Sequence, residues 1–302
     1  MTRPSRFRGW RAEELAGSEH WIFHADSHLS DAEPAALQAW LQPVLEELRD
    51  GSGAVWIRGL GTLEESKLRE LFLQFGRAIG SVDTTYGELY DVTDSGGSYR
   101  ERAIPVSQTR AATTIHTDSS RLETHPRWVG LACVRQAPEG GGSRLVSAVA
   151  VHDHLAVHHP HQLERLHQHF HRDIVTPGSQ PDPALIAANH FPIFSQDCDG
   201  PSLRYMRYWI EKGHERLGKP LTSADLEAFD ILDATLNDPA FRHDFPLSAG
   251  DLLFIDNHKL AHDREAYLDD PKAPRLMVRL WLNATVPANS TFPLDGGQAD
   301  PG

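Results

Sequence analysis

The chain has 302 residues, of which 40% are hydrophobic and 24% charged, an ordinary composition for a globular protein with a sizeable core. Its formal net charge of −13 opposes a phosphate backbone or an anionic lipid surface, so we expect neither nucleic acid nor membrane as a partner. Two cysteines, Cys133 and Cys198, are too few for a disulfide framework. The sequence shows no apolar run of about 20 residues and no signal-like N-terminus, so we expect a cytoplasmic protein.

The first third of the chain alternates between helical and strand patterns. Apolar residues at helical spacing predict a helix over Asp31–Asp50, and the short apolar run Ala54–Ile57 predicts a buried strand. Thr62 and Glu65 have the spacing of a capping box, and the apolar residues that follow them form one helical face. The next segment, Ser81–Gln108, is rich in Gly, Tyr, Asp and Ser, and we expect it to be irregular.

The later elements follow from the same patterns. The run Trp128–Val134 predicts a strand, Gly140–Ser143 a tight glycine turn, and Leu155–Arg172 a helix. Another helix is expected over Thr222–Asn237, with a buried side made of Leu226, Phe229, Leu232 and Leu236. The last part, Asp251–Asn283, predicts strands joined by a polar loop. We therefore expect the helices to gather mainly in the first half of the chain.

Three residues form a candidate metal site. On a strand, His116 and Asp118 would point to the same face because two positions separate them, and His262 comes just after the expected strand Leu252–Ile255. Two imidazoles and one carboxylate are the ligands of non-haem Fe(II) oxygenases, and they leave three coordination positions open. An isolated His-x-Asp triplet is more often a surface or capping feature, so the surrounding sequence must support this interpretation.

Two arginines after His262 supply that support. Arg275 and Arg279 lie in an apolar strand pattern and, being four residues apart, would point to the same face. An arginine is costly to bury there unless it pairs with an anion, and its planar fork suits the far carboxylate of a dicarboxylic acid. The alternative is a structural ion pair.

At these residues the chain resembles a known family. The matching motifs are HTD at His116–Asp118, PEGGGS at Pro138–Ser143, GDLLFIDNHKLAH at Gly250–His262, and RLMVR from Arg275. Together they resemble the TauD/TfdA dioxygenases, and within these the clavaminate-synthase-like and amino-acid hydroxylase members. The resemblance runs from about Gln108 to Leu282, and the first hundred residues match only in general layout.

The resemblance implies a fold. Family members share a double-stranded β-helix, a jelly-roll barrel of the cupin type with helices packed outside, so we expect a mainly β protein with flanking helices. Residues 1–302 would form a single domain. It would consist of an N-terminal helix and strand layer over about residues 1–100, a barrel core over about 101–290, and a short C-terminal tail.

The resemblance also implies roles for individual residues. His116, Asp118 and His262 would bind Fe(II), with 2-oxoglutarate as cosubstrate and O₂ as oxidant. Arg275 would pair with the distal carboxylate of 2-oxoglutarate, and Ser143 would hydrogen-bond the same molecule. Arg279 stands where the amino-acid hydroxylases bind a substrate carboxylate.

The sequence departs from the family pattern at three positions. Ser143 replaces the commoner threonine and keeps the hydroxyl. Met206 and Tyr208 occupy positions where arginine hydroxylases carry acidic residues, so we expect substrate contacts to an apolar, aromatic or anionic group rather than a strongly basic one.

Related halogenases have Gly or Ala at the position of Asp118, so its carboxylate favours hydroxylation, with desaturation or ring closure still open.

The predicted function is hydroxylation of an unactivated C–H bond in a small molecule, such as an amino acid or a metabolite derived from one. One alternative is a non-catalytic cupin-like barrel that binds a metal or ligand. Another is a metal-binding partner protein built on the histidine-rich segment His152–His171, although these histidines scatter around a helix. His125 and His258 compete with His262 as ligands, but the spacing of His262 to Arg275 matches the resemblance and favours His262. Asp256 and Asn257 end the expected strand and are candidates to orient a ligand or to cap the turn.

Overall fold

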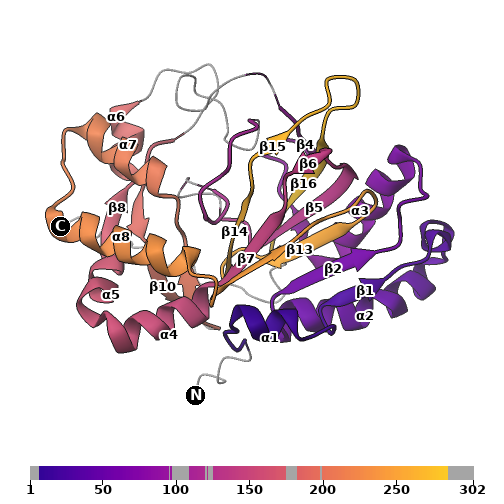
Figure 1. The fold of residues 1–302 in the computed structure, drawn as a ribbon, viewed down its shortest axis with the longest axis horizontal. Helices are drawn as coiled ribbons and strands as arrows, with labels where there is room; N and C mark the ends of the chain where they lie inside the picture. Colours follow the sequence, from indigo (N-terminus) through magenta and orange to yellow (C-terminus); the bar gives the residue numbers. More distant parts are fainter. Residues whose placement is uncertain are drawn as a thin grey trace, which may run out of the picture.

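The computed structural model describes residues 7–94, 96, 109–119, 121, 125–174, 182–197 and 199–284. Two β-sheets lie face to face, with helices covering the outer side of each (Figure 1). No helix in these segments is long and apolar enough to cross a membrane. Helices account for 36% of the structure, and the described strands do not close into a barrel.

The larger sheet has seven strands and draws on both ends of the chain. The strand order is β1-β2-β13-β5-β16-β3, and β4 also pairs with β16. These strands are β1 (Ile22–His24), β2 (Ala54–Arg58), β13 (Leu252–Asp256), β5 (Trp128–Arg135), β16 (Leu276–Asn283), β3 (Ser81–Val82) and β4 (Tyr90–Val92). Because N-terminal strands pair directly with β13, the N-terminal layer and the later strands form one sheet.

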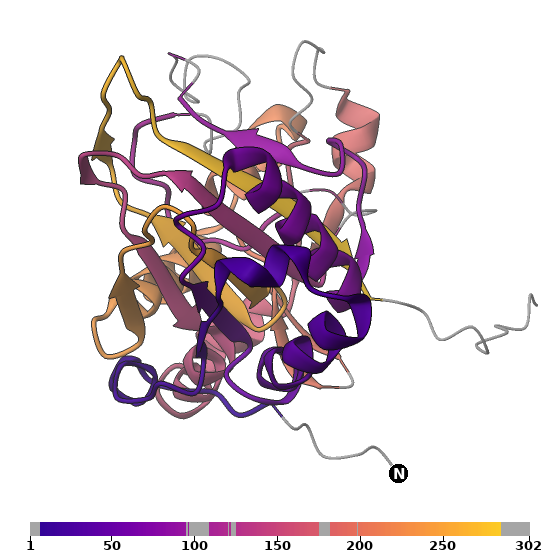
Figure 2. The same ribbon diagram turned by 90° about the vertical axis from the view of Figure 1, so that its right-hand side faces the viewer.

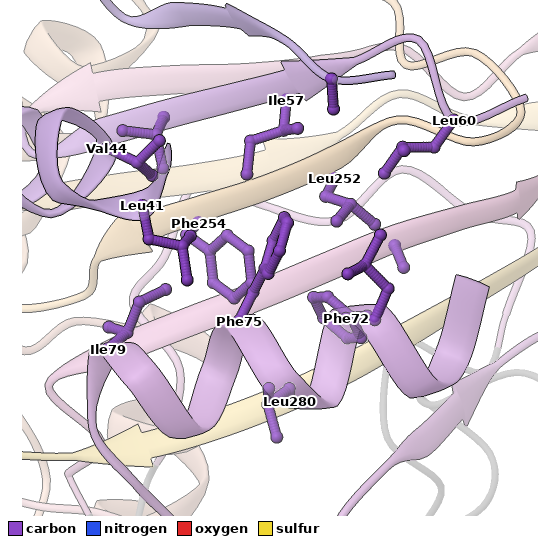
Figure 3. Packing of buried hydrophobic residues seen from close by; sticks show 14 of the residues in the cluster. Leu41, Val44, Ile57, Leu60, Phe72, Phe75, Ile79, Leu252, Phe254 and Leu280 are labelled. Atoms are coloured by element: carbon purple, nitrogen blue, oxygen red, sulfur yellow. The ribbon is translucent and has the colours of Figure 1, made fainter. Parts of the chain in front are cut away.

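Helices α2 (Pro34–Asp50) and α3 (Glu65–Ile79) cover the outer face of this sheet (Figure 2). Their apolar sides pack on the strands in one cluster, in which the rings of Phe72 and Phe254 lie 5.3 Å apart (Figure 3). Gly130 on β5 makes room for both rings, because a Cβ atom there would lie 2.8 Å from Phe254 and 2.9 Å from Phe72. The packing of α3 on the sheet therefore depends on the absence of a side chain at this position.

The smaller sheet has the order β12-β7-β14. Its strands are β12 (Arg242–Phe245), β7 (Ser143–Ser147) and β14 (Leu260–Arg264). Residues such as Leu145 on β7 and Leu260 on β14 pack with Leu253 and Met277 of the larger sheet in a second apolar cluster. The side chains of the candidate site lie between these two sheets.

The outer side of the smaller sheet carries most of the later helices (Figure 1). These are α4 (Ala148–His158), α5 (Pro160–Leu166), α7 (Arg207–Leu217) and α8 (Ser223–Asn237). The remaining elements are helices α1 (Ala12–Ala16) and α6 (Pro183–Ala188), the 3₁₀ helix η1 (Ser27–Asp31), and the strand pairs β8–β9 (His169–His171, His190–Pro192), β10–β11 (Phe194–Asp197, Gly200–Leu203) and β6–β15 (Glu139–Gly140, Tyr267–Leu268).

Most of the predicted elements are confirmed. The helices expected over Asp31–Asp50 and Thr222–Asn237 are α2 and α8, and the strands expected at Ala54–Ile57 and Trp128–Val134 are β2 and β5. At the two ends of Asp251–Asn283, β13 and β16 are the expected strands, whereas β14 and β15 lie where a polar loop was expected. Thr222 begins α8 with a capping box to Asp225, which satisfies otherwise unpaired backbone amides of the first turn.

Other expectations about the helices are wrong. The proposed capping box at Thr62 does not form, because α3 begins at Glu65 after Glu64, without a side-chain cap. The single helix expected over Leu155–Arg172 is instead α4, α5 and β8, with a break at His159 before Pro160. Proline disfavours helical geometry in the residue before it, which explains the break.

The distribution of secondary structure also differs from expectation. Five of the helices, α4 to α8, lie after residue 147, so helices do not gather in the first half. The protein is mixed α/β rather than mainly β. Within the segment expected to be irregular, β3 and β4 are short strands, and residues 95 and 97–108 lie outside the described residues.

The buried side of α8 differs from expectation at one residue. Phe229, Leu232 and Leu236 are fully buried, but Leu226 is 37% exposed. The inward position of this first turn belongs to Asp225, which accepts hydrogen bonds from Arg165 and from the backbone nitrogen of Thr222. An apolar side chain next to this polar contact gains little from burial.

This difference gives a matched pair of substitutions. We expect Leu232→Ala to lower the free energy of unfolding by about 2–5 kcal/mol, because it leaves a cavity in the core. Leu226→Ala, the same chemical change on the same helix, should cost less than about 1 kcal/mol. Urea unfolding measures both values, and equal losses would contradict the packing described for α8.

Candidate active site

A short antiparallel bridge brings the two candidate histidine ligands, His116 and His262, together. The backbone nitrogen of His116 donates to the carbonyl of His262 at 3.0 Å, and that of His262 donates to His116 at 2.8 Å. The HTD segment is thus an isolated bridge at the edge of β14 rather than a regular strand, and His262 lies within β14. The two imidazole rings are 4.7 Å apart.

The predicted metal ligands converge. One potential ligand atom from each of His116, Asp118 and His262 lies within 4.8 Å of the others, and no other such group of three occurs among the described residues. The Nε2 atoms of His116 and His262 lie 3.6 Å and 3.8 Å from Oδ1 of Asp118. All three side chains are at least largely buried.

The chemistry of these donors fits a cation. Nδ1 of His116 lies 2.7 Å from the carbonyl oxygen of Thr114, which can only accept, so this nitrogen carries the proton. In a neutral ring the lone pair is then on Nε2, which is next to a carboxylate oxygen of Asp118. Two electron-rich atoms repel each other unless a cation binds between them, and Fe(II) accepts this set of two imidazoles and a carboxylate.

Asp118 is fixed by three residues from distant parts of the chain. Its backbone nitrogen donates to the side-chain oxygen of Asn257 at 2.7 Å, and the Asn257 amide donates to its carbonyl at 3.2 Å. Nε1 of Trp281 donates to Oδ2 of Asp118 at 2.6 Å, and Nη1 of Arg279 lies 3.4 Å from the same oxygen. The carboxylate is therefore held in one orientation.

The electrostatics keep this carboxylate ionised and one imidazole neutral. Burial alone would raise the pKa of Asp118, but Arg279 and the two histidines outweigh it and hold that pKa well below its usual range. Burial lowers the pKa of His262 to about 3, and the nearby His116 acts in the same direction. A neutral imidazole can bind a metal without first losing a proton.

Arg275 is a buried cation next to the glycine turn. It is 3% exposed, and its Nε donates to Gln136 at 2.9 Å. Among the described residues no carboxylate forms an ion pair with its guanidinium, and Asp269 accepts from its backbone nitrogen instead. Burial without such a partner lowers the pKa of Arg275 and creates a site that an anionic ligand would stabilise.

The glycine turn allows this approach. Gly140 and Gly141 have φ angles of +75° and +76°, which favour glycine, and a Cβ atom at Gly141 would lie 3.2 Å from Nε of Arg275. Ser143 follows as the buried first residue of β7, opposite Arg264 of β14. The structure thus places the turn against Arg275, and Ser143 at the start of the strand that pairs with β14.

Sequence reasoning missed Arg264. Its guanidinium donates to the carbonyls of Thr109 and Ala111 at 2.8 Å each and lies 4.6 Å from the Tyr267 ring, which also contacts Arg275. Burial lowers the pKa of Arg264 to about 10. Its position two residues after His262 was the available signal, since on a strand both residues share one face.

The predicted substrate residues come from different elements of the fold. Arg279 lines a narrow surface pocket with Tyr86, Tyr90 and Trp281. Met206 directly follows Tyr205, whose backbone nitrogen and carbonyl both bond to Thr117, between the first two ligands.

Sequence reasoning also missed the hydrogen bond from Trp281 to Asp118. Its spacing of two from Arg279 on one strand was the signal. Tyr208 lies in the first turn of α7 and contacts the Trp209 ring.

The competing histidines lie elsewhere. His258 stacks on His125 with ring centroids 4.0 Å apart, and neither belongs to the metal-ligand group. The histidines of His152–His171 are spread over α4, α5 and β8, and within the described part of the chain they form no cluster at ligating distance. Asn257 does orient a candidate ligand, whereas Asp256 forms an ion pair with Arg127 at 2.7 Å and accepts from the backbone nitrogen of His258.

The family model for the Taurine catabolism dioxygenase TauD, TfdA family matches residues 12–281. The chain belongs to this family. It is therefore an oxidoreductase, a 2-oxoglutarate-dependent dioxygenase that uses Fe(II). The resemblance deduced from the motifs is confirmed, as is the assignment of iron and 2-oxoglutarate.

Two curated relatives come from Streptomyces. A uridine-5'-phosphate dioxygenase of Streptomyces sp is 32% identical over 200 residues, which cover 64% of this chain and 68% of that protein. FR-33289 synthase of Streptomyces rubellomurinus is 25% identical over 250 residues, covering 79% of this chain and 71% of the relative.

Solved structures show the same fold. Asparagine oxygenase in complex with Fe(II), 2S,3S-3-hydroxyasparagine and succinate aligns with a TM-score of 0.63 at 21% identity, covering 84% of this chain and 81% of that one. The non-heme iron oxygenase OrfP with Fe and alpha-ketoglutaric acid aligns with a TM-score of 0.58 at 16% identity, covering 85% and 83%. The chain thus has a TauD-like fold.

The buried histidines predict how stability depends on pH. Burial lowers the pKa of His258 to about 4, whereas an unfolded histidine titrates near 6.5, so between these values the unfolded chain binds more protons. The free energy of unfolding of the metal-free protein should therefore fall as the pH falls from 7 to 5, by about 2 kcal/mol for each such histidine. His262 should contribute in the same direction.

Urea unfolding at pH 7 and pH 5 checks this prediction. We expect His258→Gln to reduce the loss between the two pH values by about 2 kcal/mol, because the unfolded chain then has one proton acceptor fewer. An unchanged difference in the variant would show that His258 is not buried in its neutral form.

Proposed function

We propose that this dioxygenase hydroxylates an unactivated C–H bond of a small molecule, with release of succinate and CO₂. The observation that carries the proposal is the pairing of two sites. A two-histidine, one-carboxylate group lies at the edge of β14, and Arg275, a buried guanidinium with no ion pair among the described carboxylates, lies next to the glycine turn. A metal ion and a dicarboxylic acid are the ligands that these two sites require.

In this proposal His116, Asp118 and His262 hold the iron. When bound, the metal and 2-oxoglutarate supply the oxidising chemistry with O₂. The bond from Trp281 orients one oxygen of Asp118, and Asn257 fixes the backbone on which that carboxylate is mounted. Such contacts set the direction of a ligand and tune its basicity.

Arg275 and Ser143 hold 2-oxoglutarate. Ser143 pairs with Arg264, two residues along β14 from His262, a separation of about 6.7 Å at ordinary strand rise. Arg275 lies against Gly141 at the same end of the strand. 2-Oxoglutarate, a five-carbon diacid, is long enough to reach from the metal ligands to this end of β14. Its far carboxylate would then bind the guanidinium of Arg275 and the hydroxyl of Ser143.

Arg279, Met206 and Tyr208 contact the substrate in this proposal. Arg279 borders both Asp118 and the aromatic pocket, which supports a role in orienting an anionic group near the metal. Two substrate classes have support. Amino acids follow from the sequence resemblance, and phosphorylated nucleosides follow from the relative that is a uridine-5'-phosphate dioxygenase.

We further propose that the two facing sheets form the double-stranded β-helix of the family, within a single domain over residues 1–302. Continuous pairing from β1 through β13 to β16 supports one structural unit. The alternative is a non-catalytic barrel that binds a metal or ligand without turnover. The joint presence of the metal-binding group and the buried Arg275 favours an enzyme.

Succinate release tests the reaction and the role of Arg275. A panel of amino acids and nucleoside 5'-phosphates, supplied with Fe(II), 2-oxoglutarate and O₂, should contain a compound that gains one oxygen atom with matching succinate. We expect Arg275→Gln to raise the KM for 2-oxoglutarate by about 30-fold or more, because it removes a buried charge partner worth at least about 2 kcal/mol.

Arg275→Lys is the matched control for charge. It keeps the positive charge but loses the planar fork, so its KM should fall between the wild type and Arg275→Gln. A KM unchanged in all three proteins would remove Arg275 from the site. Absence of protein-dependent succinate with every compound would contradict the proposed substrate classes.

Trp281 gives a separate test of the iron site. Trp281→Phe removes the hydrogen bond to Asp118 while keeping an aromatic ring, and we expect Fe(II) affinity to fall by about 10- to 100-fold. Anaerobic competition with a chromophoric chelator measures this change. Trp40→Phe is the control. Trp40 stacks on Phe75 in the distant helical layer, so this substitution should leave the Fe(II) affinity unchanged. Equal affinities in the wild type and Trp281→Phe would contradict a role for this bond.

A further inference from the structure

Three histidines share one face of the short ribbon formed by β8 and β9, which lies next to α7 (Figure 1). Antiparallel pairing places His171 directly opposite His190, and His169 lies two residues before His171 on the same face. The residues between them, Phe170 and Phe191, point to the other face and are buried. The pairing register therefore gathers three imidazoles on one side, while the two phenylalanines pack inward.

The spacing of the three rings matches that of ligands around one metal ion. The ring centroids of His169 and His190 lie 5.4 Å apart, and those of His171 and His190 lie 5.3 Å apart. An imidazole nitrogen binds zinc at about 2.1 Å, so two ring centres in a tetrahedral site lie about 5 Å apart. His190 is therefore at the distance from both neighbours that a shared ion requires.

The side chains must still rotate to bring their nitrogens onto one point. In the structure their ligand atoms do not converge as those of His116, Asp118 and His262 do. His169 and His190 are exposed, and exposed side chains change rotamer readily. The backbone positions, which the ribbon pairing fixes, already suit a common ion.

His171 is held so that one of its nitrogens faces a cation. Its backbone nitrogen donates to Nε2 of His214 at 3.1 Å, and Nδ1 of His214 donates to the carbonyl of Lys219 at 2.8 Å. Both nitrogens of His214 thus serve to fix the backbone at His171. Nζ of Lys219 lies 3.4 Å from Nε2 of His171, and because an ammonium group can only donate, this Nε2 carries a lone pair.

The charge state of His171 also suits a metal ligand. Burial lowers its pKa, and the charges of Lys219, His214 and His190 act in the same direction. A histidine that stays neutral near pH 7 can bind a metal without first losing a proton. Lys219 is exposed on a flexible stem, so its ammonium group can move away when a dication takes its place.

We propose that His169, His171 and His190 bind one divalent transition-metal ion, zinc above all, at a site separate from the iron centre. Three imidazoles and a water molecule complete the tetrahedral shell of zinc, and imidazole suits zinc, copper and nickel rather than magnesium or calcium. The ion would fasten β8 to β9 beside α7, the helix whose first turn carries Tyr208. The site does not depend on the proposed substrate or reaction.

The zinc content of the protein at equilibrium tests the site. The protein is dialysed against buffer with about 1 µM free zinc, and bound metal is counted by mass spectrometry. We expect about two equivalents in the wild type, because two imidazoles and a carboxylate at the iron site also bind zinc. His190→Gln should lose one equivalent, and His116→Ala should lose the other.

His158→Gln is the matched control for the many other histidines. The rings of His154 and His158 lie 4.4 Å apart on α4, so this pair is a competing place for zinc. We expect His158→Gln to keep both equivalents, since two imidazoles alone give an incomplete zinc site. Thermal unfolding verifies that each variant folds, and His169→Gln carries the test if His190→Gln does not.

A stability measurement gives a second readout of the same site. In His116→Ala only the ribbon site should remain, so zinc should raise the unfolding temperature of this variant. Zinc should not raise that of the double variant His116→Ala/His190→Gln.

Two results would overturn the site. One is a zinc content of His190→Gln equal to that of the wild type, and the other is an equivalent lost in His158→Gln instead. Loss of the full zinc content in His116→Ala alone would do the same, because it would leave no ion for the ribbon.

Discussion

The fixed position of the Asp118 carboxylate is the constraint on which the site depends. Asn257 holds its backbone from the turn between β13 and β14, and Trp281 holds its side chain from β16. The histidines approach it through the bridge between His116 and His262. Because these contacts come from both sheets, the site can form only when the two sheets pack face to face. Packing of the two sheets therefore also assembles the candidate metal site.

A second feature is positive charge buried beside neutral side chains. Arg275 bonds to an amide and contacts a ring. This arrangement costs free energy in the ligand-free protein, and a bound anion would recover that cost. Arg275 lies at the glycine turn, against Gly141. The position of Arg275 supports the proposal that it binds the dicarboxylic cosubstrate.

The sequence pointed to His116, Asp118, His262 and Arg275 because their residue types are chemically specific, and the structure brings the three candidate ligands together. It missed contacts that depend on the folding of distant segments. The bond from Trp281 to Asp118 spans 163 positions, and no local pattern reports it. Secondary structure was predicted where apolar periodicity was strong, as in α8, and was wrong around Pro160. The exposed Leu226 shows that periodicity identifies a helical face but cannot tell which turn of it is covered.

The central claim is that one iron ion and one 2-oxoglutarate bind together at the triad and Arg275. Anaerobic titration of the wild type with Fe(II) and 2-oxoglutarate tests it most directly, because chelation of the metal by this ligand gives a weak visible charge-transfer band. The account predicts that the band appears in the wild type and is weakened in both His116→Ala and Arg275→Ala. A wild type that binds iron without giving the band would contradict it.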